Sequence, residues 1–156
     1  MTITSVTDSN YLSPIRWAMV IDFDLRPVTY HCQRISLPSL SVGPAIQDYK
    51  QYTAHFTGDK IKFGPFTARF IILEDFSNYK LIFDWMISGA NTSQTLQKDI
   101  ILLYYTNSNN PAGQIKIANA IVTELTPVEF DTTQTSTEYL YADITFSTDY
   151  YQFVIE

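Results

Sequence analysis

Cysteine, glycine and basic residues are all scarce in this chain of 156 residues. Cys32 is the only cysteine. No disulfide can therefore form within the chain, and no zinc site with several thiolate ligands is available. We expect Cys32 to be a buried, inert thiol. Only five glycines stand against 11 Tyr and 10 Phe, which favours broad contact surfaces as well as a core.

Positive charge is also too sparse for a nucleic-acid-binding protein. The chain has 10 Lys and Arg against 16 Asp and Glu, a formal net charge of −6. Binding to nucleic acid requires clustered cations that displace counterions from phosphates, and the densest basic feature is the pair Lys60 and Lys62. A mildly acidic surface past which DNA slides without sticking remains compatible with this composition.

Long apolar runs are missing as well. No stretch approaches the ~20 apolar residues that a membrane-spanning helix needs. Residues 1–13 are polar and lack the basic start and apolar run of a secretory signal. We therefore expect a protein made in the cytoplasm with no membrane partner, and a flexible N-terminal arm over residues 1–13.

Aromatic residues, in contrast, are abundant. Apolar residues make up 46% of the chain, and it holds 11 Tyr and 10 Phe. This composition predicts a folded chain with a substantial core, which we assign to one domain over residues 14–156. Tyrosine has a large apolar body and a polar tip, so the composition also favours extensive contact surfaces.

The hydrophobic pattern is mainly that of β-strands. Large apolar residues recur at every second position over 17–23, which is the periodicity of a strand. Residues 28–35 suggest a second strand that forms a hairpin with the first. Further strands are predicted at 60–63, 66–73, 99–105, 114–124 and 139–148, with a short one at 128–131. The fold class is therefore mainly β: an antiparallel sandwich or barrel of about seven or eight strands with one α-helix.

One helix is predicted. Asp75 or Ser77 can cap its start, and Gly89 can close its end. Its apolar stripe consists of Phe76, Tyr79, Ile82, Phe83 and Met86. Trp85 lies on a flanking face. It either packs in the core or contacts a neighbouring subunit.

Residues 41–57 form the least regular part of the chain. Residues 39–44 read as an irregular connection, and 45–57 as a long extended excursion or a loose hairpin, followed by a turn at Gly58-Asp59. Tyr49, Tyr52 and Phe56 need a cover if this segment is exposed. The cover is either a partner or, if the segment folds back, the domain's own core.

No constellation of catalytic residues is visible in the sequence. His31 and His55 lie in different elements, and no pair of histidines has a metal-binding spacing. Asp22 and Asp24 read as a solvated end of a strand, and no Gly-flanked serine elbow is present. We therefore expect that the protein is not an enzyme and that it has no catalytic site, metal site or cofactor.

An ordered set of short motifs resembles the tail-tube superfamily of contractile phages. The motifs are Leu37-Pro38, a long loop, Gly58-Asp59-Lys60, the strand 66–73, Asn78-Tyr79, Asp84-Trp85 and a strand that opens with Asp99-Ile100. The resemblance covers about residues 16–155. The order from the acidic residues 74–75 to Asp99-Ile100 is especially similar to tube-initiator proteins of the baseplate.

This resemblance implies a structural virion protein that forms stacked hexameric rings, either as the repeating tube subunit or as a tube initiator next to the baseplate. It would be assembled in the host cytoplasm and located in the tail of the virion. The loop at 41–57 would then contact the adjacent ring, with Val42, Ile46, Tyr49, Tyr52 and Phe56 as contact candidates and Trp85 as a further one. The partners implied are copies of the chain, other tube or baseplate hub proteins, the tail sheath and the tape-measure protein, with DNA passing through the channel unbound.

Two other functions stay open at this stage. A β-barrel that binds a small ligand would line its cavity with aromatics such as Tyr104, Tyr139 and Tyr141. A carbohydrate-binding or attachment module would instead present exposed Tyr and Trp.

Overall fold

The computed structural model describes residues 11–21, 31–91, 96–135 and 138–154, which form nine strands and one helix. Residues 1–10, most of the predicted N-terminal arm, lie outside this range. The elements are β1 (Trp17–Val20), β2 (Cys32–Ile35), β3 (Leu40–Asp48), β4 (Thr53–Phe63), β5 (Phe66–Ile71), α2 (Ser77–Asn91), β6 (Lys98–Tyr105), β7 (Pro111–Leu125), β8 (Tyr141–Ser147) and β9 (Tyr150–Val154).

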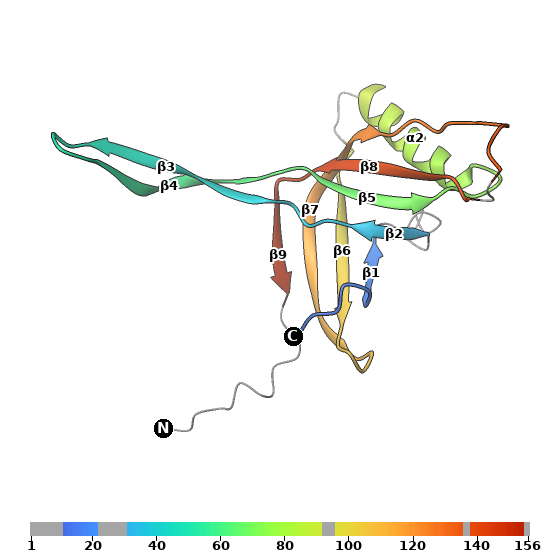
Figure 1. The fold of residues 1–156 in the computed structure, drawn as a ribbon, viewed down its shortest axis with the longest axis horizontal. Coiled ribbons are helices and arrows are strands. Elements are labelled where there is room, and N and C mark those ends of the chain that lie inside the picture. Colours follow the sequence, from blue (N-terminus) through green and yellow to red (C-terminus); the bar gives the residue numbers. More distant parts are fainter. Residues whose placement is uncertain (1–10, 22–30, 92–95, 136–137, 155–156) are drawn as a thin grey trace.

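The body of the molecule consists of two sheets that share the long strand β7. The N-terminal part of β7 pairs with β6 and β9, and β6 pairs in turn with β1. The C-terminal part of β7 pairs with β8, followed by β5 and β2. The two groups of strands cross at a steep angle in Figure 1. We call them the β1-β6-β7-β9 sheet and the β7-β8-β5-β2 sheet.

Strand β7 changes sheets at Asn119. This residue has a φ of 55°, a left-handed conformation that Asn tolerates better than most residues. Its amide N–H donates to Asp99 Oδ1 at 3.1 Å and its Nδ2 donates to Asp149 Oδ2 at 3.0 Å. A local irregularity of this kind bends a strand and lets it leave one sheet for another. The interruption of the Ile pattern at Asn119 therefore marks the corner of the fold.

The core lies between the two sheets and is closed by α2. Phe66 and Phe70 on β5 and Phe146 on β8 are at most 1% exposed. The rings of Phe66 and Phe146 stack with centroids 5.0 Å apart. Each fully buried side chain of this size stabilises the fold by about 1.5–3 kcal/mol. The cross-strand pair Ala68 and Ile144 continues the same packed layer.

The start of α2 depends on Asn78, whose side chain is fully buried. Its Oδ1 accepts hydrogen bonds from the amides of Leu73 and Tyr79, and its Nδ2 donates to the Ile71 carbonyl at 2.6 Å. Asp75 Oδ1 accepts the Ser77 amide at 3.0 Å, as the capping prediction required. The Asn-Tyr motif thus fixes the junction between β5 and the helix by satisfying backbone groups that would otherwise be buried unpaired.

The predicted fold class is confirmed: the described residues are mainly β, with antiparallel strands and one helix. Several details differ. The strands at the two ends of the 17–35 region do not form a hairpin with each other, because β1 pairs with β6 and β2 pairs with β5. Alternation identifies a strand but not its partner. The chain also has a final strand, β9, and no strand at 128–131.

The helix differs from its prediction in two ways. It continues through Gly89 to Asn91, since Gly89 does not adopt the positive φ of a terminating glycine. Phe83 is 51% exposed, whereas Trp85 is 6% exposed and occupies the core. The buried face is therefore rotated toward Ile82 and Trp85.

Candidate assembly interface

Strands β3 and β4 form a long hairpin, residues 40–63, that projects from the body; we call it the arm. In Figure 1 it extends far beyond the body on one side. Its two strands pair with each other in a separate two-stranded sheet. Every residue of β3 is exposed. The segment 41–57 is therefore neither an irregular loop nor folded back on the core, and the loose hairpin considered from the sequence is a regular one.

The arm grows directly out of the β2–β5 pair. The Ser36 amide donates to the Thr67 carbonyl at 2.9 Å, and the Gly64 amide donates to the Ser39 carbonyl at 2.8 Å. These bonds carry the antiparallel pairing across the short interruptions at 37–39 and 64–65. Pro38 is buried. The arm is therefore anchored to the body through paired backbone rather than through a single flexible connection.

Gly43 and Gly58 form a bulge in the middle of the arm, where the sequence had suggested irregular structure and a turn. The pairing shifts between Val42, opposite Ile61, and Pro44, opposite Thr57. A Cβ at Gly58 would collide with the Gly43 carbonyl oxygen. The turn predicted at Gly58-Asp59 is thus wrong: glycine here serves a close approach of two backbones inside a ribbon.

The tip of the arm is the true turn. The Tyr49 amide donates to the Tyr52 carbonyl at 2.8 Å. The rings of these two tyrosines stack with centroids 5.0 Å apart, yet the residues remain 44% and 64% exposed. Lys50 is also exposed at this turn. The tip therefore presents a pair of aromatic rings and an exposed lysine in the same turn.

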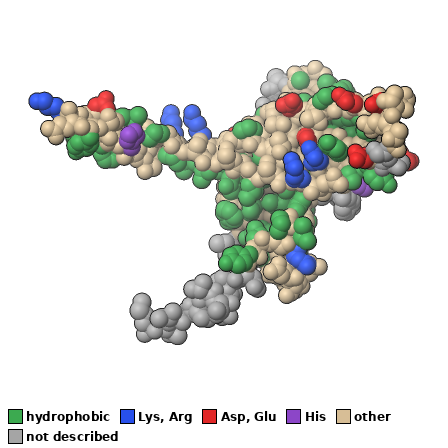
Figure 2. Space-filling model, viewed as in Figure 1, with side chains coloured by type: hydrophobic (Ala, Val, Ile, Leu, Met, Phe, Trp, Pro, Cys, Tyr) green, Lys and Arg blue, Asp and Glu red, His purple; other side chains and the backbone are tan. Residues whose placement is uncertain are grey.

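One face of the arm is an apolar strip. Leu40 lies opposite Phe63 and Val42 lies opposite Ile61, so these four side chains point to the same side. Ile46 lies beyond the bulge, on the same strand. Leu40, Ile46 and Ile61 are each more than half exposed. Hydrophobic side chains run along the arm in Figure 2.

The apolar strip continues onto the body. The ring of Phe63, at the base of the arm, packs edge-on against Tyr151 of β9 with centroids 5.3 Å apart. Tyr151 contacts Phe153 in the same way, and Phe153 is 58% exposed. Exposed apolar surface therefore reaches from the arm to the edge strand β9. Extended apolar surface of this kind is typical of protein contact sites.

The sequence-derived contact candidates fall into two groups. Val42, Ile46, Tyr49, Tyr52 and Phe56 all lie on the arm and are all exposed. Phe56 pairs with Ala45 and is 52% exposed. Ile61, Phe63 and the aromatic rings of β9 were not singled out from the sequence. Their signal was the apolar alternation of 61 and 63.

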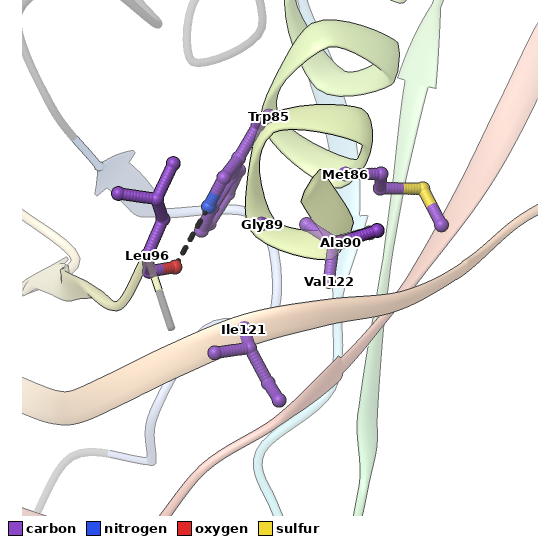
Figure 3. A pocket seen from close by; sticks show the side chains of 7 residues that line it. All are labelled: Trp85, Met86, Gly89, Ala90, Leu96, Ile121 and Val122. Carbon is purple, nitrogen blue, oxygen red and sulfur yellow. Dashed lines mark hydrogen bonds between the residues drawn. The ribbon is translucent and has the colours of Figure 1, made fainter. Parts of the chain in front are cut away.

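Trp85 is buried in the body instead. Its Nε1 donates to the Leu96 carbonyl at 3.0 Å, and its ring lies 6.1 Å from that of Phe146. Figure 3 shows it at one side of a shallow cavity of about 290 Å³ between α2 and β7. This burial leaves little indole surface for contact with a neighbouring subunit.

Edge strands add a second potential contact. Within the described residues, β1 pairs only with β6, and β9 pairs only with β7. Each of these two end strands of the β1-β6-β7-β9 sheet therefore has one edge without a partner strand in the described part of the chain. Unpaired strand edges carry free N–H and C=O groups that favour pairing with another chain. The two edges are different surfaces, so a contact between them joins copies head to tail.

The titratable and metal-ligating side chains of the described residues bear on the expectations from the sequence. No group of three or more His, Cys, Asp or Glu among them is arranged to hold a metal ion. Burial raises the pKa of the Cys32 thiol to about 11. Helix α2, the helix of the described residues, is not a candidate for crossing a membrane. Tyr139 and Tyr141 are exposed rather than lining an internal cavity.

No protein-family model and no curated protein sequence matches this chain. Solved structures do. The anti-feeding prophage cap, described as its tube-terminating cap, covers 100% of both chains at 16% identity with a TM-score of 0.78. A chain of the PVC sheath–tube complex, from an extracellular contractile injection system in its extended state, covers 100% of this chain and 99% of its own at 16% identity, with a TM-score of 0.75.

A third match is Hcp1 from Flavobacterium johnsoniae, which is 15% identical and covers 88% of this chain and 94% of its own with a TM-score of 0.55. At such identities the matches establish architecture. The resemblance seen in the sequence is thereby confirmed at the level of fold. This chain has the tail-tube fold, which it shares with solved structures from contractile injection systems and with Hcp proteins.

Proposed function

We propose that this protein is a structural subunit of the tube of a contractile injection machine, and that it works by assembling into stacked rings. The observation that carries the proposal is the arm, a ribbon of exposed apolar and aromatic side chains that no other described part of its own subunit covers. An isolated two-stranded hairpin is only marginally stable in water. A neighbouring copy that packs on the arm would cover the exposed apolar side chains and would also stabilise the hairpin.

In this proposal the ring closes through the two unpaired edges of the β1-β6-β7-β9 sheet. A contact between β1 of one copy and β9 of the next is head-to-tail, and repeated head-to-tail contacts either close into a ring or continue as a helix. Buried side chains of this sheet pack in one core with those of the β7-β8-β5-β2 sheet and α2. The outside of a ring has a larger circumference than the inside, so the bulky side of each subunit faces outward in this proposal. The opposite face of the β1-β6-β7-β9 sheet then lines the channel. Hexameric rings, as in the resembling family, are our expectation.

The arm then bridges one ring to the next. Two of the structures with this fold come from a sheath–tube complex and a tube-terminating cap. We accordingly propose the same kind of partners for this chain: further tube subunits, a cap or baseplate ring, and a surrounding sheath. The phage tail favoured by the sequence is one machine of this class, with its tape-measure protein and DNA as the contents of the channel.

Electron microscopy of the purified protein tests the proposal. We expect rings or short tubes in negative stain, and a light-scattering mass several times that of one chain. Because tube growth often needs a template, the protein should also be co-expressed with the products of neighbouring reading frames. A strictly monomeric species at high concentration, with and without those partners and at low and high salt, would rule the proposal out.

A further inference from the structure

A second groove lies at the end of the body opposite the arm. It is formed by the connection between β7 and β8 and by the start of β8, and its volume is about 290 Å³. Its wall includes the apolar Val128 and the rings of Tyr139 and Tyr141. Glu129 and Glu138 bring two carboxylates to the same groove. It is therefore an aromatic groove with negative charge.

This groove is open. Tyr139 is 81% exposed and Tyr141 is 52% exposed. The guanidinium of Arg69 lies 4.2 Å from the Tyr141 ring centroid, but its charge is balanced by Asp143, whose Oδ1 lies 2.8 Å from Arg69 Nε. The two glutamates consequently set the sign of the groove. Acidic side chains gather at this end of the molecule in Figure 2.

The tip of the arm has the complementary chemistry. Tyr49 and Tyr52 offer two stacked, exposed rings, and Lys50 between them in sequence offers a positive charge. Aromatic pairs are stabilised beyond the area that they bury, and an ammonium group is attracted both to carboxylates and to ring faces. Charge complementarity of this kind selects a partner and fixes its register.

The placement of the two features makes the contact intermolecular. The arm leaves the body on one side, and the β7–β8 connection lies at the other end (Figure 1). Strand β3 has nine residues, a span of about 30 Å. An anchored arm of that length points away from its own groove. A tip-to-groove contact therefore joins two different surfaces of two copies, and it repeats from copy to copy.

We propose that the groove between Glu129 and Glu138 receives the arm tip of a second copy of this chain. Tyr49 and Tyr52 pack against Tyr139 and the apolar wall, and the Lys50 ammonium lies between the two carboxylates. This inference rests on the proposed function, because it names the surface that covers the arm tip in the assembly.

Charge reversal tests the contact. The variant Lys50→Glu and the double variant Glu129→Lys/Glu138→Lys should each lower the assembled fraction at least about tenfold, because each places like charges together. The variant that combines all three changes restores opposite charges and should recover most of the assembly. Lys60→Glu is the matched control, since it makes the same charge change at an exposed position away from the tip. Equal losses in the Lys50 and Lys60 variants, or no recovery in the combined variant, would overturn the proposal.

Cross-linking separates this proposal from the proposed function. A chain carrying Gln51→Cys is mixed with one carrying Gln134→Cys, and a mixed disulfide dimer is expected under mild oxidation. Native Cys32 is a poor competitor because its thiol is partly buried and protonated at neutral pH. In the control, Gln114→Cys replaces Gln134→Cys and should give no dimer. Gln114 lies in β7, where this strand pairs with β6 and β9, away from the groove.

The outcomes are distinct. Rings without the Gln51–Gln134 cross-link would overturn the groove assignment and leave the tube function standing. The cross-link without rings under any condition would retain the contact and refute the tube. If the charge variants assemble normally and soluble glycans quench the groove tyrosines, the groove is a carbohydrate site, and the arm tip has another receptor.

Discussion

At the scale of single residues, Gly58 determines whether the arm can form. Its backbone lies so close to the Gly43 carbonyl that a side chain has no room. Gly43, directly across the ribbon, has open space around it and no positive φ. The two glycines thus form a matched pair in which one tolerates a methyl group and the other does not.

Gly58→Ala should therefore disrupt the pairing of β3 with β4 and reduce assembly strongly, while Gly43→Ala should assemble like the original chain. Both variants should keep a melting temperature close to that of the original chain, because the arm contributes nothing to the buried core. Thermal melts and sedimentation velocity measure the two effects. Equal assembly of the two variants would show that the bulge has no role.

Trp85 is a second informative residue, and its role is stability. Trp85→Ala removes a large buried side chain and the hydrogen bond from Nε1 to the Leu96 carbonyl. We expect a loss of about 3–5 kcal/mol in the free energy of unfolding of the monomer. Phe83→Ala, on the exposed side of the same helix, should cost less than about 1 kcal/mol.

Chemical denaturation of both variants measures this difference. A small cost at Trp85 together with a loss of assembly would instead restore the subunit contact that the sequence left open for this residue.

At the scale of elements, the arm and the body obey different rules. The strands of the body bury one face, so their alternation is visible in the sequence, as in β8 where Ala142, Ile144 and Phe146 are all buried. The strands of the arm bury neither face within the subunit. Neither face of the arm needs to be apolar for the subunit to fold, so the sequence of the arm lacks a clear alternation of apolar and polar residues and reads as irregular.

A triple variant in which Tyr49, Tyr52 and Phe56 are each replaced by Ser tests whether these side chains serve assembly rather than the stability of the body. We expect the monomer to keep its melting temperature, since all three side chains are exposed, and ring stacking to weaken. Light scattering and microscopy measure the stacking.

The matched control for this variant replaces Thr53 and Thr57, also exposed on the arm, with Ser. A collapse of the melting temperature in the aromatic variant alone would mean that the arm tip packs on its own body.

At the scale of the whole molecule, the β5–β8 pair links stability to pH through Asp143. Arg69 donates from Nε and Nη2 to the two carboxylate oxygens of Asp143 at 2.8 and 3.1 Å. This hydrogen bonding lowers the pKa of Asp143 below its ordinary value. Folding therefore favours the ionised carboxylate. Its contribution is complete above the unfolded pKa, about 3.9, and is lost as pH falls through the lower folded value.

Asp143→Asn should consequently be less stable than the original chain at neutral pH, and its melting temperature should fall less steeply below about pH 4. Asp59→Asn, at an exposed position on the arm, is the control and should keep the original slope. Melting curves between pH 2 and pH 7 are the measurement. Parallel curves for the original chain and Asp143→Asn would show that the ion pair does not contribute.

The sequence by itself determined the class of fold, the presence of the helix, most of the body strands and the absence of a disulfide within the chain. These follow from local periodicity and from residue counts, which need no knowledge of the partner of any strand. Even the motif Asn78-Tyr79 was visible, although its reason, three hydrogen bonds at the start of α2, was not.

Only the tertiary structure decided which strands pair, that β7 turns from one sheet to the other at Asn119, and that residues 40–63 leave the body as a ribbon. Pairing and projection depend on contacts between residues far apart in the chain, and a one-dimensional pattern does not encode them. In the arm, Gly and Pro marked a bulge rather than an end, because the backbone geometry that glycine permits is the same in both settings.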